Sequence, residues 1–195
     1  MYGPIAETIR TQRLVLEPLA VHHADEMAPV LDDPRLHRYI GGEPLTRDEL
    51  RARYEHLVAG PAPFHQECWL NWIVRRARDG QAVGYVQATV TPTAPGFTVT
   101  PPSAGSTVTP GPPRTIASVA WVIGMPYQGF GFATEAARAL LAWLRAHGVA
   151  AIVATIHPDN RASAAVATKL GLHPTDETRD DEIVWRPPRH NTSGS

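Results

Sequence analysis

The sequence predicts an α/β protein with a mixed, mainly antiparallel sheet. Its predicted elements run strand, helices, three strands, helix, strand, helix and strands, which is not the regular alternation of a doubly wound fold. The dipeptide Asp79-Gly80 joins two extended segments and favours a tight hairpin, so those two strands should be antiparallel. A length of 195 residues suits one domain with a substantial core.

The first half of the chain begins with a strand pattern followed by two helix patterns. Residues 13–19 (RLVLEPL) alternate apolar and polar side chains, as a half-buried strand does. Residues 22–33 and 46–60 carry apolar residues at helical spacing. Thr46 is placed to cap the second of these helices and Gly60 to end it.

Three extended segments follow the predicted helices. Residues 69–77 (WLNWIVRRA) and 82–90 (AVGYVQATV) are rich in β-branched and aromatic side chains, and residues 78–81 supply the turn between them. A third extended segment spans residues 115–124 (TIASVAWVIG). These three segments should be neighbouring strands.

The second half of the chain alternates helix and strand patterns. Residues 133–148 have helical periodicity, and Gly148 is placed to end that helix. A short buried strand is predicted for residues 150–156, another amphipathic helix for 159–171, and two late strands near 172–178 and 181–187.

An insertion rich in threonine and proline interrupts the predicted sheet. Residues 88–114 consist of three nine-residue units that share the sequence TVTP. Such short, proline-rich units bury too little surface to form a solenoid, so we interpret residues 91–114 as a mobile loop produced by tandem expansion. The alternative is a flap over an active site or a partner-binding arm. We expect residues 1–187 to form a single domain and residues 188–195 a flexible tail.

Composition excludes several classes of function. The formal net charge of −1 gives no electrostatic basis for binding nucleic acid or an anionic membrane. Cys68 is the single cysteine, which rules out an intrachain disulfide and a cysteine metal cluster. No signal peptide and no long apolar run is present, so we expect a cytoplasmic protein without a membrane or nucleic-acid partner and without a metal.

The segment YQGFGFATEA, residues 127–136, combines two glycines with the start of a helix. Gly129 and Gly131 permit a positive φ or a close approach of a ligand to the backbone. The helix start adds unpaired amide groups and the positive end of the helix dipole, which together suit a phosphate group. The alternative is a simple turn that happens to contain two glycines.

Two familiar phosphate motifs do not fit this segment. A P-loop requires Gly-Lys-Ser/Thr at the helix start, where this chain has Phe132, Ala133 and Thr134. A dinucleotide fingerprint requires a third glycine at Thr134 and an acidic residue on the next strand, which AAIVATI lacks. The remaining reading is a pyrophosphate site of a third kind.

Two motifs resemble the GNAT superfamily of acyl-CoA-dependent N-acetyltransferases. Residues 128–133 (QGFGFA) fit its Gln/Arg-x-x-Gly-x-Gly/Ala signature, and the phrase AWVIGMPYQGFGFATEA resembles the Rim-like branch that acetylates ribosomal-protein N-termini. The spacing Asn160-x-x-Ser163, followed by residues 169–171 (KLG), resembles the end of the family's coenzyme region. The opening RTQRLVLEPL is also similar to this branch, and the resemblance spans roughly residues 10–187.

The resemblance implies a GNAT fold of about seven strands, in which acetyl-CoA lies between two splayed central strands. Strand amides would bind pantetheine, glycine-loop amides would bind pyrophosphate, and Asn160 would bind pantetheine or cap its helix. The implied coenzyme-binding residues are Val122, Ile123, Gly124, Gln128, Gly129, Phe130, Gly131, Phe132, Ala133, Thr134, Asn160 and Ser163.

The catalytic groups depart from the family's pattern. Ser118 stands where many relatives carry a glutamate base, and Ala167 stands where a tyrosine acid is frequent. We therefore assign proton relay to Ser118 and protonation of the leaving thiolate to Ser163. Glu43 and Glu67 are reserve bases, with a solvated surface charge as the alternative for each. Four residues are weaker candidates for the acceptor side: Tyr39, Glu43, Trp72 and Tyr85.

The predicted activity is transfer of acetyl from acetyl-CoA to a primary amine by direct attack in a ternary complex. An α-amine with a pKa of roughly 7.7–8 is partly neutral near pH 7, whereas a lysine amine near about 10.4 is not. A protein N-terminus or a small amine therefore suits an enzyme without a strong base, acting as a monomer or homodimer. The alternatives are a non-catalytic acyl-CoA sensor and, third, a nucleotide-dependent oxidoreductase.

Overall fold

The computed structural model describes residues 3–62, 65–93, 97–99, 108–110 and 114–188. Most of the TVTP insertion and nearly all of the predicted tail lie outside the described residues. Among the helices that are described, none is long and apolar enough to span a membrane. In chain order the elements are β1 (Ile9–Arg10), β2 (Leu14–Pro18), η1 (Val21–His23), α1 (Ala24–Leu31), α2 (Pro34–Ile40), α3 (Arg47–Ala59), β3 (Cys68–Arg76), β4 (Ala82–Thr93), β5 (Phe97–Val99), β6 (Val108–Pro110), β7 (Arg114–Ile123), η3 (Met125–Tyr127), α4 (Phe132–Ala146), β8 (Ala151–Ile156), α5 (Arg161–Lys169), β9 (His173–Arg179) and β10 (Glu182–Arg186).

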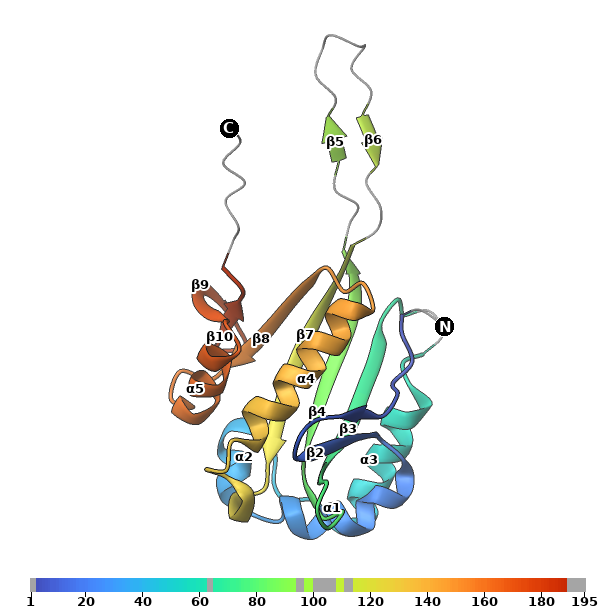
Figure 1. Ribbon diagram of the computed structural model, residues 1–195, viewed down its shortest axis with the longest axis vertical. Helices are drawn as coiled ribbons and strands as arrows, with labels where there is room; N and C mark the ends of the chain where they lie inside the picture. The colour runs from blue at the N-terminus through green and yellow to red at the C-terminus, as the bar shows by residue number, and fades with distance from the viewer. Residues whose placement is uncertain (1–2, 63–64, 94–96, 100–107, 111–113, 189–195) are drawn as a thin grey trace.

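One eight-stranded sheet organises the molecule, in the order β1-β2-β3-β4-β7-β8-β10-β9 (Figure 1). Every neighbouring pair in it is antiparallel except β7 and β8, which are parallel. The predicted mixed, mainly antiparallel sheet is confirmed. β5 and β6 form a separate two-stranded sheet.

The parallel pair at the middle of the sheet is short. β7 and β8 pair only from Ile116↔Ala151 to Ser118↔Val153, whereas β7 continues along β4 as far as Gly84↔Ile123. The rest of β8 pairs with β10 instead. Beyond Ser118, therefore, the edge of β7 that faced β8 is no longer covered by a strand, and the two central strands diverge.

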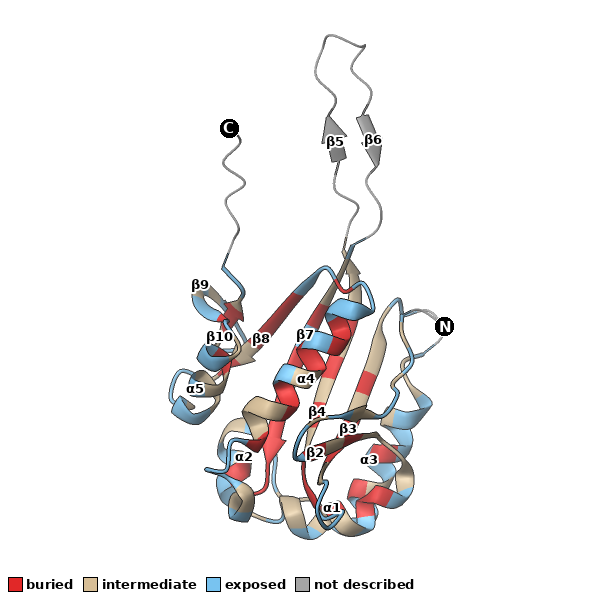
Figure 2. Ribbon diagram, in the orientation of Figure 1, coloured by how far each residue is buried: buried red, intermediate tan, exposed pale blue. Residues whose placement is uncertain are grey.

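Helices cover both faces of the sheet (Figures 1 and 2). Along β3, Trp72 and its alternate neighbours belong to the main buried cluster with α4, while Ile73 belongs to a second buried cluster with α1 and α3. β3 is therefore covered on both sides, which explains its nearly continuous apolar sequence. Burial of these side chains supplies the main driving force for folding.

Local signals account for where two of the helices begin. At α3, Thr46 and Glu49 form a reciprocal capping box, which confirms the predicted start. The separate helix α2 was not predicted. Its signal was nevertheless present, because Asp33 accepts a hydrogen bond from the Arg35 amide (2.9 Å) and Pro34 occupies the first turn.

The insertion leaves and re-enters the sheet at a single point, where Thr93 pairs with Arg114. Replacing residues 94–113 by Asn-Gly should therefore close β4 and β7 as an ordinary hairpin. We expect the melting temperature to change by only a few degrees, because the described members of the main buried cluster all lie outside the replaced segment. Calorimetric unfolding checks this expectation, and loss of cooperative unfolding would show that the insertion is part of the core.

Candidate functional site

A cleft of about 570 Å³ opens where β7 ends. It is bounded by β7, the glycine loop, the start of α4, α5 and α2, which gather at the lower left of Figure 1. Most of the predicted coenzyme residues line this cleft, namely Val122, Ile123, Gln128, Gly129, Gly131, Phe132, Ala133, Thr134, Asn160 and Ser163. The fold thus brings together two motifs that are well separated in sequence.

The backbone of the glycine loop supplies a run of free donors. Gly129 (φ 82°) and Gly131 (φ 79°) both adopt left-handed conformations, as predicted for a loop that presents bare main chain. The first backbone bond of α4 runs from the Glu135 amide to the Gly131 carbonyl. Within the described part of the chain, no group accepts a hydrogen bond from the amides of residues 129–134. Free amides at the positive end of a helix dipole are suited to binding an anion, so we call this stretch the candidate anion site.

A charged cluster of Thr11, Arg13 and Glu135 fixes the geometry of this loop. The Glu135 carboxylate accepts hydrogen bonds from the Thr11 hydroxyl (2.6 Å), the Arg13 amide (2.9 Å) and the Arg13 Nε (2.7 Å). Arg13 Nη1 also donates to the Phe130 carbonyl (3.0 Å), and the guanidinium lies over the Phe132 ring. Arg13 therefore holds that carbonyl away from the anion site and ties β2 to the start of α4.

The same cluster explains how an acidic residue is tolerated beside an anion site. Burial by itself would raise the pKa of Glu135, but the hydrogen bonds from Thr11 and Arg13 outweigh it and hold the pKa below its ordinary value. The carboxylate is thus ionised and neutralised by Arg13. Without Arg13, its charge would oppose a bound phosphate.

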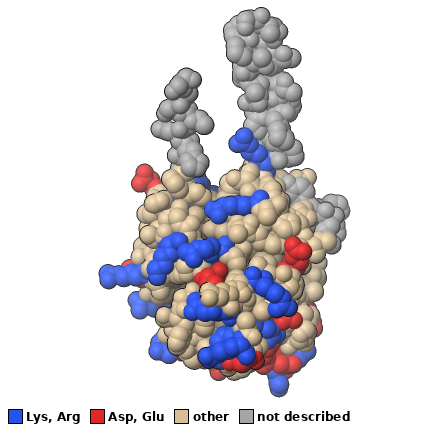
Figure 3. Space-filling view, in the orientation of Figure 1, with Lys and Arg blue, Asp and Glu red and all other residues tan. Residues whose placement is uncertain are grey.

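Basic side chains stand at the rim of the cleft. Arg35, Arg38 and Lys169 all line it, from α2 and from the end of α5. Figure 3 shows more basic than acidic groups on the face of the molecule that α4 covers. A ligand with several phosphate charges would be attracted to this side.

The strand amides do not all face the cleft, which corrects part of the sequence-based assignment. The Gly124 amide donates to the Val83 carbonyl (2.9 Å), so it is not available to a ligand. The alternation of an antiparallel ladder gives the Val122 amide the same direction, toward β4. Ile123 is then the residue whose main chain faces the gap, and its carbonyl accepts a hydrogen bond from Gln128 Nε2 (2.9 Å).

The helix-capping role of Asn160 is visible in the structure. Its Oδ1 accepts a hydrogen bond from the Ser163 amide (3.1 Å) at the start of α5. The hydroxyl of Ser163 and the NH₂ group of Asn160 form no hydrogen bond within the described residues, and both residues line the cleft. Capping and ligand binding are therefore compatible at Asn160.

Two residues predicted for the site, Ser118 and Phe130, line neither cavity, and a third, Trp72, has a core side chain. Ser118 is exposed, is the last residue of the parallel pairing, and lines neither of the two cavities. Trp72 lines a second cavity beside the cleft, but its indole is fully buried, packs on Trp143 and donates its N–H to the Glu7 carbonyl (2.9 Å), so the side chain belongs to the core. The side chain of Phe130 is 61% exposed and does not line the cleft.

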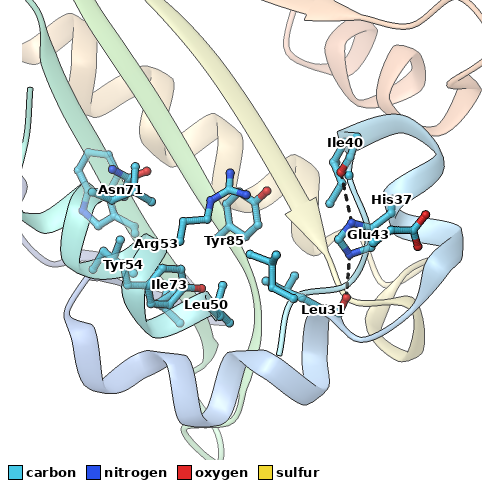
Figure 4. Close-up of a pocket in the computed structure, with 16 residues that line it drawn as sticks. Leu31, His37, Ile40, Glu43, Leu50, Arg53, Tyr54, Asn71, Ile73 and Tyr85 are labelled. Carbon is cyan, nitrogen blue, oxygen red and sulfur yellow. Dashed lines mark hydrogen bonds between the residues drawn. The ribbon is translucent and has the colours of Figure 1, made fainter. Parts of the chain in front are cut away.

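A second cavity, of about 140 Å³, adjoins the first and shares Ile40 with it (Figure 4). It lies between α3, the loop after α2 and the strands β3 and β4. Glu43, Trp72 and Tyr85, all predicted for the acceptor side, line this cavity. Tyr39 instead lines the cleft, where its hydroxyl donates to the Asp159 carbonyl (3.2 Å). Glu67 lines neither cavity.

Several functional candidates escaped the sequence analysis. The Arg13–Glu135 contact joins residues 122 positions apart, and no local sequence pattern predicts it. Arg53 and Tyr54, which line the second cavity, look like ordinary members of an amphipathic helix. In the part of the chain that is described, no group of His, Cys, Asp and Glu side chains is arranged to hold a metal.

Comparison with known proteins matches the chain to a family model described as an acetyltransferase (GNAT) domain, over residues 13–173. A solved acetyltransferase from Agrobacterium tumefaciens is 24% identical, with a TM-score of 0.66, and the match covers 97% of this chain and 98% of that one. A GNAT-family acetyltransferase from Bacillus anthracis is 19% identical, with a TM-score of 0.62 and coverage of 92% and 94%.

A ribosomal L7/L12 alpha-N-protein acetyltransferase, RimL, solved in complex with coenzyme A, has the same fold. It is 14% identical, with a TM-score of 0.63, and the match covers 92% of this chain and 96% of that one. No curated protein sequence matches the chain.

Proposed function

Because the chain belongs to the GNAT family of acetyltransferases, and is thus an acyltransferase, we propose that it transfers acetyl from acetyl-CoA to a primary amine. The acceptor is a small molecule or a protein N-terminus, and transfer occurs by direct attack in a ternary complex. The observation that carries this proposal is the run of free amides at residues 129–134 beside the diverging strands.

The residues of the cleft fit coenzyme A. The free amides and the rim cations suit its diphosphate and its further phosphate. The uncovered edge of β7 suits the amide groups of pantetheine, which can pair with a strand as another strand would. The neighbour RimL, which shares the fold, was solved with coenzyme A bound.

The residues of this chain divide the chemistry between the two cavities. Bound acetyl-CoA would supply an acetyl group activated as a thioester. The Ile123 amide, on the gap side of β7, would donate a hydrogen bond to a carbonyl oxygen in the cleft, a type of contact worth several kcal/mol in comparable sites. Ser163, which lines the cleft, would donate a proton to a leaving thiolate.

The proton acceptor is the step where sequence and structure differ most. Ser118 is the residue that replaces the family glutamate, but it lines neither cavity. Glu43 lines the acceptor cavity near Ile40, where the two cavities meet. We propose that Glu43 takes the proton of the incoming amine, directly or through water.

A thiol-release assay with acetyl-CoA and a panel of amines tests the proposal. We expect release of free coenzyme A that depends on the amine, and a loss of rate of about 10- to 100-fold in Glu43→Gln with little change in coenzyme affinity. Glu55→Gln, a change of an α3 carboxylate that lines neither cavity, is the matched control. Coenzyme binding without amine-dependent turnover would contradict the proposal and favour a sensor role.

A further inference from the structure

Four hydrogen-bonding side chains on one side of the acceptor cavity have no partner among the described residues. Arg53, Tyr54, Asn71 and Tyr85 all line this cavity (Figure 4). Within the described residues, none of these four side chains takes part in a hydrogen bond or ion pair. Tyr54 is buried, where polar groups are normally paired, whereas Asn71 and Tyr85 are partly buried and Arg53 is exposed. All four side chains can donate hydrogen bonds, and none of them carries a negative charge.

Tyr54 is the sharpest case. It is only 4% exposed, and its hydroxyl is buried without a hydrogen-bond partner. Burial raises the pKa of both Tyr54 and Tyr85, so each hydroxyl stays protonated and remains a donor. An unpaired buried donor costs free energy. A bound ligand or a water molecule that accepts its hydrogen bond would remove that cost.

Arg53 stands apart from its neighbours on α3. Arg47 and Arg51 both form ion pairs with Asp25, whereas no ion pair among the described residues involves Arg53. In Figure 4 its side chain extends toward the ring of Tyr85, and its charge acts on the Tyr85 hydroxyl. An arginine without an acidic partner, beside uncharged donors, is suited to a carboxylate, which it can bind through two parallel hydrogen bonds.

Aliphatic side chains form much of the remaining cavity wall, which also includes His37, Glu43 and Trp72. The aliphatic side chains include Leu19, Leu31, Leu45, Leu50, Leu57 and Ile73. A volume of about 140 Å³ is close to that of apolar cavities that hold a benzene ring, which need roughly 150 Å³. The cavity therefore has room for one apolar group of that size, and not for an extended polycation.

On another side, the cavity presents Glu43 near Ile40, the residue that it shares with the coenzyme cleft. An amine on this side would lie beside the cleft, with an acidic group to accept its proton. The two sides of the cavity therefore differ: Arg53 and the other donors lie on α3 and the strands, and the exposed Glu43 lies on the loop after α2, beside the cleft.

We infer that the acceptor is a small amine with an apolar body and a carboxylate, of the amino-acid class, whose carboxylate is held by Arg53 with Tyr54, Asn71 and Tyr85. The inference rests on the proposed function and narrows it. It disfavours a protein N-terminus, because a polypeptide has no carboxylate beside its first residue, and it disfavours a polyamine.

Matched pairs of amines test this inference. Phenylalanine and 2-phenylethylamine differ by the carboxylate, as do leucine and isopentylamine, while spermidine and a peptide with an N-terminal phenylalanine represent the other classes. We expect Arg53→Gln to raise the KM for phenylalanine by about tenfold or more and the KM for 2-phenylethylamine by less than about threefold. Arg51→Gln, which changes an arginine that pairs with Asp25 outside the cavity, should change neither.

The variant Tyr54→Phe provides a second test, in which stability and affinity for phenylalanine are measured together. A purely structural role of the hydroxyl would not produce the expected combination of results. Removing an unpaired buried hydroxyl should leave the stability of the free protein unchanged or raise it. It should nevertheless weaken binding of phenylalanine by about three- to tenfold. A loss of stability without a loss of affinity would overturn the role given to this hydroxyl.

Calorimetric binding of the same amines to the protein with coenzyme A separates this inference from the proposed function. Binding of phenylalanine that depends on Arg53, without any acetyl transfer, would support the inference and refute the enzyme activity. Transfer to 2-phenylethylamine, spermidine or the peptide at rates equal to or above that for phenylalanine, with Arg53→Gln inert, would refute the inference and leave the activity standing.

Discussion

Gly131→Asp is expected to weaken coenzyme A binding by at least about 100-fold. Gly131 has a φ of 79°, and its amide belongs to the free run at the start of α4. A carboxylate there would lie beside the bound diphosphate, and like charges placed together in a binding site cost several kcal/mol. Isothermal titration calorimetry with coenzyme A gives the affinity directly.

Gly131→Asn is the matched control for this substitution. Asparagine has nearly the same shape as aspartate and tolerates a left-handed conformation about as well, but it carries no charge. A Cβ at this position would meet only Arg13 Nη2, at an ordinary 3.6 Å. We therefore expect Asn to cost about tenfold or less, and equal losses for Asp and Asn would show that charge at the phosphate site is not the cause.

Glu135→Ala is expected to lower the free energy of unfolding by about 2–3 kcal/mol and to weaken coenzyme binding as well. The substitution leaves the Thr11 hydroxyl, the Arg13 amide and the Arg13 guanidinium without their shared acceptor. Arg13 remains half-exposed, so water replaces part of what is lost. Chemical denaturation measures the first effect and calorimetry the second.

Glu55→Ala on α3 is the surface control for that measurement, with an expected change within about 0.5 kcal/mol. If Glu135→Ala were as mild as this control, the cluster of Thr11, Arg13 and Glu135 would be a surface feature without a role in holding the loop.

The contribution of Glu135 should also depend on pH. Its pKa is lowered in the folded protein from an ordinary value of 4.5, so its stabilising effect is fully present above that value. The effect is lost as the pH falls through the lower, folded-state pKa. The stability difference between wild type and Glu135→Gln should accordingly shrink on acidification, whereas a constant difference would contradict an ionised carboxylate.

The order and type of the elements could be predicted because each is encoded locally. The Asp79-Gly80 turn, the capping box at Thr46 and the helical periodicity before Gly148 depend on neighbouring residues alone. The glycine loop was also predictable, because a positive φ at Gly129 and Gly131 followed by a helix start requires this residue pattern.

The sequence alone does not predict which backbone amides and side chains of a strand face the site, because this depends on the register of the strand and on its neighbours. Whether the amide of Val122, Ile123 or Gly124 faces the gap is decided by the pairing of Gly124 with Val83, which no local pattern records. Trp72 lines the second cavity, but β3 is buried on both faces and the indole packs into the main core, which the sequence alone does not show. The direction of a side chain on such a strand follows from register.

Contacts between residues far apart in the sequence could not be predicted either. Arg13 opens the strand pattern RLVLEPL, and Glu135 is an acidic residue in the first turn of α4, yet together they hold the glycine loop in place. Ser118 illustrates the reverse error, since its place in a family motif suggested a catalytic role, while in the structure it lies outside both cavities.

The central claim is that free main-chain amides at the start of α4, beside the diverging strands, bind the diphosphate of coenzyme A. Amide hydrogen exchange followed by NMR, with and without coenzyme A, tests it residue by residue. The account predicts that the amides of residues 129–134 become protected on binding, together with that of Ile123, while the Gly124 amide, already bonded to Val83, changes little. Saturating coenzyme A that leaves residues 129–134 exchanging at their free rates would contradict it.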